Sequence, residues 1–416
     1  MSRFILTASF CAAALAAAGP AGHPALLAAA PGGAGAGADS RVAAMIEGIV
    51  AERLLDQVDA LVAFGTRRWD QPGGRLAQDS IIDFFSSLGL DEVYTHDFDA
   101  GADNVIGVLR GAIRPERIHV VGAHYDSEVA GDNPAAPAPG ADDNASGAAA
   151  LLEIARAIAG TGVRPAETIL FAAFTAEEEG LVGSRAFVAD LIKEQAEVAD
   201  MINLDVIGYL APGTRLDISV TSDTFTPAVQ ALVARMAEVA ALYLPERPFE
   251  VGNPPPCRKC SDHSAFVESG YPAATIFEDL QYFCPFMHSA NDVVGIALNS
   301  PELVETDARL TAAAVAILAG LFDLADGPSF ARGDVIPDGS LNITDVIALL
   351  EYLLLGGASP GCLEAADSND DGELDISDPV RILLALFAGQ APLPPPSCGT
   401  DPTEDALGCG VPATCR

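Results

Sequence analysis

The feature that most constrains the fold is an alternation of short apolar runs with longer amphipathic segments across residues 39–325. The short runs are rich in β-branched residues, which is typical of strands buried on both faces. Strands that alternate with helices favour a layered α/β domain with a largely parallel sheet. We expect strands at 117–123, 168–174, 200–207 and 273–277, and helices at 147–159, 181–189, 227–242 and 302–324.

The segments on either side of this domain differ from it in composition. Residues 1–18 combine Arg3, an apolar run and a small-residue cleavage site, which is the pattern of a secretory signal peptide. The apolar run is shorter than the roughly 20 residues that a membrane-spanning helix needs. We expect a signal peptide at 1–18, a Gly/Ala-rich linker at 19–38, the main domain at 39–325, a small domain at 330–390 and a Pro/Cys-rich tail at 391–416.

The net charge and the cysteine content indicate which partners the protein binds and in which compartment it is found. The chain has 22 basic and 58 acidic residues, a net charge of −36 at pH 7, and this field disfavours nucleic acid as a partner. Cysteines that follow a signal peptide are typical of a disulfide-bonded, exported protein. We therefore expect a protein that is secreted or tethered at the cell surface, with no membrane span in the mature chain. Cys257 and Cys260 favour a disulfide over a zinc knuckle, because a second cysteine pair for a knuckle is missing.

Histidines and carboxylates follow the predicted strands in a regular order. His124 and Asp126 lie two residues apart on an extended chain, so their side chains share a face and the carboxylate can orient the imidazole. Taken singly, each later acidic motif has a simpler explanation, such as an acidic helix cap or solvated glutamates. Together, imidazoles and carboxylates without thiolates suit zinc, and the surplus of carboxylates suggests two ions with a bridging acid.

Six motifs follow one another along the chain: H-Y-D-S at 124–127, P-G-A-D-D-N-A-S-G at 139–147, A-E-E-E-G-L-V-G-S-R at 176–185, N-L-D at 203–205, S-D-H-S-A-F at 261–266 with G-Y-P-A-A at 270–274, and H-S-A-N-D at 288–292. Together they resemble the co-catalytic dizinc aminopeptidases. That metallopeptidase family also includes glutamate carboxypeptidases, glutaminyl cyclases and the non-enzymatic transferrin-receptor ectodomain. The resemblance covers residues 39–325 and implies a zinc peptidase domain with a three-layer α/β/α fold around a mixed, mostly parallel, twisted eight-stranded sheet.

The resemblance also implies a ligand set for two zinc ions. Asp143 falls at the position of the carboxylate that bridges the two ions. His124 and Asp205 would complete one site, and Glu178 and His288 would complete the other. All five residues are therefore expected to meet in one place.

The same resemblance implies roles for three further carboxylates. Glu177 falls at the position of the general base, which would take a proton from the attacking water and return it to the leaving amine. Asp126 falls at the position of the carboxylate behind His124, and Asp292 is expected to support His288 in the same way. Zinc would lower the pKa of the water and polarise the scissile carbonyl.

This sequence departs from the family pattern at the residue that donates a hydrogen bond to the oxyanion. Family aminopeptidases commonly offer a tyrosine hydroxyl, but Met287 stands before His288 and no tyrosine lies between the two cysteines at 257 and 260. We expect the donor to be one of three nearby residues, Tyr282, Arg258 or Lys259.

The segment at 330–390 has a separate signature of two calcium loops. The second loop carries Gly372 at position 6, where a sharp turn is needed. The first loop begins 33 residues earlier (367 − 334) and has Ile336 at position 3, so we expect it to bind calcium more weakly. Each loop leads into an apolar helix, at 343–355 and 376–388, and the pair resembles a dockerin module, which implies a cohesin-like scaffold partner. The expected calcium ligands are Asp334, Asp338, Asn342 and Asp345 in the first loop, and Asp367, Asn369, Asp371, Asp375 and Asp378 in the second.

The sequence thus predicts a secreted dizinc metallo-exopeptidase, an aminopeptidase acting on the N-terminal residues of peptides and tethered by a dockerin-like module. One alternative is another activity of the same family, that of a carboxypeptidase, a dipeptidase or a glutaminyl cyclase. A cyclase is disfavoured because His124 is kept. The other alternative is a non-catalytic binding protein on a peptidase fold, and the intact ligand set with Glu177 argues against it.

Overall fold

The computed structural model describes residues 38–98, 101–131, 133, 135–253, 255, 258–322, 330–390, 399, 407 and 409. The predicted signal peptide, all but one residue of the linker and most of the cysteine-rich tail lie outside these residues. Within the described part of the chain, no helix has both the length and the apolar character needed to cross a membrane.

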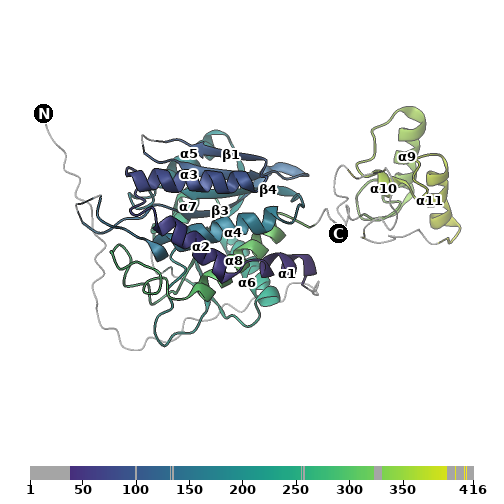
Figure 1. Cartoon of the computed structure of the whole chain (residues 1–416). Coiled ribbons are helices and arrows are strands. Elements are labelled where there is room, and N and C mark those ends of the chain that lie inside the picture. Colours follow the sequence, from purple (N-terminus) through teal and green to yellow (C-terminus); the bar gives the residue numbers. More distant parts are fainter. Residues whose placement is uncertain are drawn as a thin grey trace. The chain divides into compact units, whose positions relative to one another are not determined.

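An eight-stranded mixed sheet forms the centre of the main domain (Figure 1). Its strand order is β1-β2-β4-β3-β5-β8-β6-β7. Four neighbouring pairs are parallel and three are antiparallel, which confirms a mixed, mostly parallel sheet. The strands are β1 (Glu92–His96), β2 (Asn104–Leu109), β3 (Arg114–His124), β4 (Glu167–Phe174), β5 (Glu197–Leu204), β6 (Ile218–Thr221), β7 (Phe249–Gly252) and β8 (Ala273–Phe277).

Helices cover both faces of this sheet, and each face has its own apolar core. Successive residues of a strand point to opposite faces, so Val121 packs into one core and Val120 into the other. The larger core contains residues of α1 (Ser40–Glu47), α2 (Ala51–Val62), α3 (Pro72–Ser87), α4 (Gly147–Ala159), α6 (Pro227–Tyr243) and α8 (Pro301–Leu318). The smaller core contains residues of α5 (Val182–Lys193) and α7 (His263–Glu268). The main domain therefore has the expected three layers.

Two predicted elements end earlier than the sequence suggests. The strand expected at 200–207 is β5, which ends at Leu204, because Val206 has a φ of 42° and turns the chain out of the sheet. The helix expected at 302–324 is α8, which ends at Leu318, and Gly320 follows with a φ of 62°. Both positive φ values lie in the left-handed region, which a regular strand or helix does not use. The early end of β5 places Asp205 in the loop beyond the strand.

The segment at 330–390 folds around an apolar core of its own, formed by Val335, Val346, Leu349, Ala366 and Ile382. Its helices are α9 (Ile343–Leu355), α10 (Leu363–Ala366) and α11 (Ser377–Phe387). Two of them match the helices predicted after the acidic loops. A disulfide joins Cys362 to Cys409. We call this part of the chain the C-terminal module.

Candidate metal centre

The five predicted zinc ligands come from segments that end at one edge of the sheet. His124 is the last residue of β3, Asp205 follows β5 directly, and Glu178 lies four residues beyond β4. Because β3, β4 and β5 are parallel, their carboxyl ends lie together, which is where ligands bind in such sheets. Asp143 comes from the short helical segment η1 (Ala141–Ser146), and His288 from the loop after β8.

The carboxylate of Asp143 lies between two histidines. Its Oδ1 is 3.4 Å from Nε2 of His124, and its Oδ2 is 3.1 Å from Nε2 of His288. Nε2 of His124 is also 3.2 Å from Oδ1 of Asp205, and Nε2 of His288 is 3.0 Å from Oε2 of Glu178. The structure thus brings all five residues together as two clusters that share Asp143 through different oxygens.

This donor set fits two divalent cations. Oε1 of Glu178 is buried and has no hydrogen-bond partner. Burial, followed by the nearby Asp143 carboxylate, raises the pKa of Glu178 to about 8. The hydrogen bonds to Asp143 and Glu178 raise the pKa of His288 to about 12. Carboxylates this crowded repel one another unless positive charge lies between them, and zinc accepts this mixture of imidazole nitrogen and carboxylate oxygen.

Asp126 connects one metal-ligand cluster to the loop that carries Glu177. Its Oδ1 is 3.4 Å from Nδ1 of His124. The same carboxylate accepts hydrogen bonds from the backbone N–H groups of Glu177 and Glu178, each at 3.3 Å. Asp126 therefore lies behind His124, as predicted, and it also positions the glutamates.

Asp292 has a different role from the predicted one. Its carboxylate accepts hydrogen bonds from the backbone N–H groups of Asp142, at 2.8 Å, and Asp143, at 3.0 Å. Among the described residues, no hydrogen bond joins this carboxylate to His288. The prediction that Asp292 supports His288 is therefore wrong: Asp292 holds the segment that carries the bridging aspartate.

Sequence reasoning missed Arg67, a fully buried arginine. Its guanidinium donates hydrogen bonds to the carbonyl oxygens of Tyr125 at 2.7 Å, Pro139 at 2.6 Å and Gly140 at 2.8 Å. These contacts join the loop after β3 to the loop before η1. Burial lowers the pKa of Arg67 to about 10, which leaves it positively charged at neutral pH. No motif marks this position, because its partners are backbone carbonyls from distant segments.

Asp262 is a second buried residue for which the sequence predicted no role. Both of its carboxylate oxygens lack a hydrogen-bond partner. Burial, opposed by His124, raises its pKa to about 7. The motif S-D-H-S-A-F at 261–266 marked the segment, but nothing in the sequence showed that the aspartate lies near the metal ligands.

The predicted oxyanion donors receive only partial support. The Lys259 ammonium is 2.7 Å from Oε1 of Glu268, and this ion pair disfavours it as the donor. The Tyr282 side chain is exposed. Tyr282 and Arg258 stay candidates. Cys260 is disulfide-bonded, but Cys257 lies outside the described residues, so the pairing of these two cysteines stays a prediction.

Comparison with known proteins finds similarity to zinc metallopeptidases. Residues 104–308 match the model of peptidase family M28. A probable leucine aminopeptidase of Arthroderma otae is 35% identical over 190 residues, which cover 44% of this chain and 49% of the relative. Another, from Trichophyton verrucosum, is 28% identical over 270 residues, which cover 61% and 70%. The chain thus spans only about half of the first relative.

The fold also matches a solved structure. The LapA aminopeptidase of Legionella pneumophila superimposes with a TM-score of 0.59 at 22% identity, over 68% of this chain and 75% of that one. At this level of identity, the likeness shows the shared fold.

Proposed function

We propose that this protein is a dizinc aminopeptidase that hydrolyses N-terminal residues from peptides. The observation that carries the proposal is the Asp143 carboxylate, whose two oxygens face two separate histidine–carboxylate clusters. The probable leucine aminopeptidases among its relatives favour aminopeptidase over carboxypeptidase or cyclase activity.

The residues of the site have separate roles in peptide hydrolysis. Two zinc ions held by the five ligands would lower the pKa of an attacking water and polarise the scissile carbonyl. Glu177 accepts the proton of this water and delivers it to the leaving amine. Burial raises the pKa of Glu177 well above its ordinary value, which brings a carboxylate closer to the range useful to a general base at neutral pH. Asp126 contacts the His124 ring and accepts the backbone N–H of Glu177, and it thereby fixes the position of these two residues relative to each other.

Two substitutions at neighbouring positions test this assignment. Glu177→Gln is expected to keep both zinc ions and to lower turnover by about 10²- to 10⁴-fold, the usual contribution of a general base. Glu178→Ala is expected to lose zinc, because it removes a ligand. Metal content by elemental analysis, together with turnover of peptides with a free N-terminus, a blocked N-terminus or a blocked C-terminus, checks both. Normal turnover by Glu177→Gln, or hydrolysis of N-terminally blocked peptides only, would contradict the proposal.

The C-terminal module is proposed to bind calcium through its two acidic loops. In the second loop, Asp367 accepts the backbone N–H of Gly372 at 2.8 Å, and Asp378 accepts that of Asp375 at 2.9 Å. These bonds fold the loop around its carboxylates. Oδ1 of Asp334 and Oδ1 of Asn369 are buried without a hydrogen-bond partner, and oxygen atoms of this kind suit calcium.

An apolar surface on this module supports the proposal that it docks onto a protein partner. Three exposed apolar residues of α9 and three at α11 occupy equivalent positions, because each member of the second set lies 33 residues after one of the first. Positions i, i+4 and i+11 share one face of a helix, so each helix presents an apolar stripe. Such exposed stripes mark interaction sites. The residues are Ile343, Ile347 and Leu354 in α9, and Val380 and Phe387 in α11 with Ile376 directly before it.

We therefore propose that the module tethers a secreted enzyme to a cohesin-like scaffold. Calcium titration of the full chain by calorimetry, for the parent, Asp367→Ala and Asp334→Ala, tests the metal sites. The parent is expected to bind two ions, more tightly in the second loop, and each variant is expected to lose one. A parent that binds no calcium would rule out this role for the loops.

A further inference from the structure

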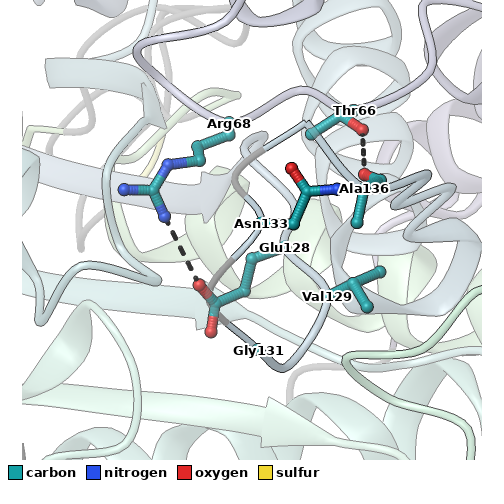
Figure 2. A pocket seen from close by; sticks show the side chains of 7 residues that line it. All are labelled: Thr66, Arg68, Glu128, Val129, Gly131, Asn133 and Ala136. Atoms are coloured by element: carbon teal, nitrogen blue, oxygen red, sulfur yellow. Dashed lines mark hydrogen bonds and ion pairs between the residues drawn. The ribbon is translucent and has the colours of Figure 1, made fainter.

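The main domain contains a cavity of about 220 Å³. Figure 2 shows the residues that line it. Its wall includes polar side chains from two segments, Thr66 and Arg68 before α3, and Glu128 and Asn133 in the loop after β3. Thr66 donates a hydrogen bond to the carbonyl oxygen of Ala136, which joins the two segments across the cavity. The space exceeds what one water molecule needs and can hold an extended side chain.

Glu128 connects this cavity to the metal ligands. A carboxylate oxygen of Glu128, one of Glu178 and a ring nitrogen of His288 lie within 4.8 Å of one another. The backbone N–H of Ala130 donates a hydrogen bond to the carbonyl oxygen of His288 at 3.0 Å, which fixes the cavity wall to this ligand. The His288 side chain is 45% exposed, whereas that of His124 is 1% exposed. The cavity therefore lies on the open side of the metal centre.

The charge around the cavity is negative overall. The only guanidinium among its described lining residues, that of Arg68, has its Nε 2.9 Å from Oδ1 of Asp70. Arg68 also pairs with Glu179, and its Nη1 lies 3.7 Å from Oε2 of Glu128. One positive charge thus faces three carboxylates, and this balance attracts a cationic ligand rather than an anionic one.

Five other carboxylates around the metal centre face partners within the protein. Asp126 and Asp292 accept backbone N–H groups, and the carboxylate ligands face the histidines. Within the described part of the chain, the Glu128 carboxylate forms one ion pair, at 3.7 Å from Arg68, and accepts no hydrogen bond. Its side chain is 28% exposed. Glu128 is therefore free to accept hydrogen bonds from a substrate.

We propose that Glu128 binds a cationic group of the peptide substrate at the mouth of this cavity. The inference rests on the proposed peptidase function and names a specificity residue for it. The cation has two possible sources, the N-terminal ammonium of any substrate, or a lysine or arginine side chain that enters the cavity.

Binding to a chain that does not turn over tests this role separately from catalysis. Leucine amide and lysine amide are titrated by calorimetry into zinc-loaded Glu177→Gln, alone and combined with Glu128→Gln. Loss of one charge-assisted hydrogen bond is expected to raise the Kd by about 10- to 100-fold. An increase for both amides identifies the N-terminal ammonium, and an increase for lysine amide alone identifies the side chain.

Asp70→Asn, in the same Glu177→Gln background, is the matched control. It removes a charge that also pairs with Arg68 but does not line the cavity, and the Kd of both amides is expected to stay unchanged. An unchanged Kd after Glu128→Gln would overturn the inference, as would loss of zinc from that variant, because Glu128 would then be a metal ligand. Binding through Glu128 without hydrolysis by the parent would instead overturn the proposed function alone.

Discussion

The Asp292 carboxylate accepts a hydrogen bond from the backbone N–H of Asp143 at 3.0 Å, although the two residues are 149 positions apart. A second bond, from Asp142, reaches the other carboxylate oxygen. Asp292 thus orients the backbone that carries the bridging carboxylate, and outer partners of this kind tune metal affinity.

Asp292→Ala is expected to lower zinc affinity by about 10- to 100-fold, because the Asp143 segment loses both anchors. Chelator competition measures this affinity. Asp292→Asn keeps one acceptor oxygen and is expected to give a smaller loss. Equal zinc affinity in the parent and the alanine variant would show that Asp143 is held by other contacts.

Arg67→Met is expected to destabilise the main domain by about 3 kcal/mol or more. The substitution leaves the carbonyl oxygens of Tyr125, Pro139 and Gly140 without their charged donor; those of Tyr125 and Gly140 are buried, and an unsatisfied buried group costs about 1–3 kcal/mol. Urea unfolding measures the change. Arg68→Met provides the matched control at the next residue, whose exposed ion pairs are worth about 1 kcal/mol or less. Similar losses in both variants would contradict a special role for Arg67.

Asp307→Asn is expected to stabilise the protein, and the gain should grow with pH. The carboxylate is fully buried in α8, neither oxygen has a hydrogen-bond partner, and burial raises its pKa well above the ordinary value. A carboxyl group whose pKa is raised in the folded state loses stability as the pH rises from its unfolded pKa through its folded pKa. The asparagine has no charge to bury.

The free energy of unfolding in urea, measured for the parent and Asp307→Asn at pH 5 and pH 8, tests this expectation. The difference between the two chains is the informative quantity, because other titrating groups affect both equally. A difference that is the same at both pH values would rule out ionisation of Asp307 as its source.

The Cys362–Cys409 disulfide is expected to stabilise the C-terminal module by about 4 kcal/mol, since it closes a loop of 47 residues. Replacement of both cysteines by serine in the full chain should lower the temperature at which α9 and α11 unfold in calcium. Far-ultraviolet circular dichroism follows this transition, and the melting of the main domain serves as an internal reference. An unchanged transition would show that the apolar core of the module is sufficient.

The ligand set of the candidate metal centre was predicted from the resemblance of local motifs to the dizinc aminopeptidases, and strand directions predicted that part of it lies together. Each ligand motif adjoins a short apolar run, and parallel strands bring their carboxyl ends to one edge of a sheet, so His124, Asp205 and Glu178 could be placed together without coordinates. The strands β1, β2, β6 and β7 were missed. They are only four to six residues long, and their pairing depends on the rest of the sheet.

The amino-acid sequence by itself determined the layered α/β class, because the spacing of apolar residues decides it, and the resemblance of its motifs to the dizinc aminopeptidases implied the five metal ligands and the general base, which stay predictions. Only the tertiary structure decided that Asp292 anchors Asp143, that Arg67 joins two loops and that Glu128 lies beside His288. These contacts form between loops distant along the chain. Their partners are backbone groups or side chains that no local periodicity marks, so they appear only once the chain has folded.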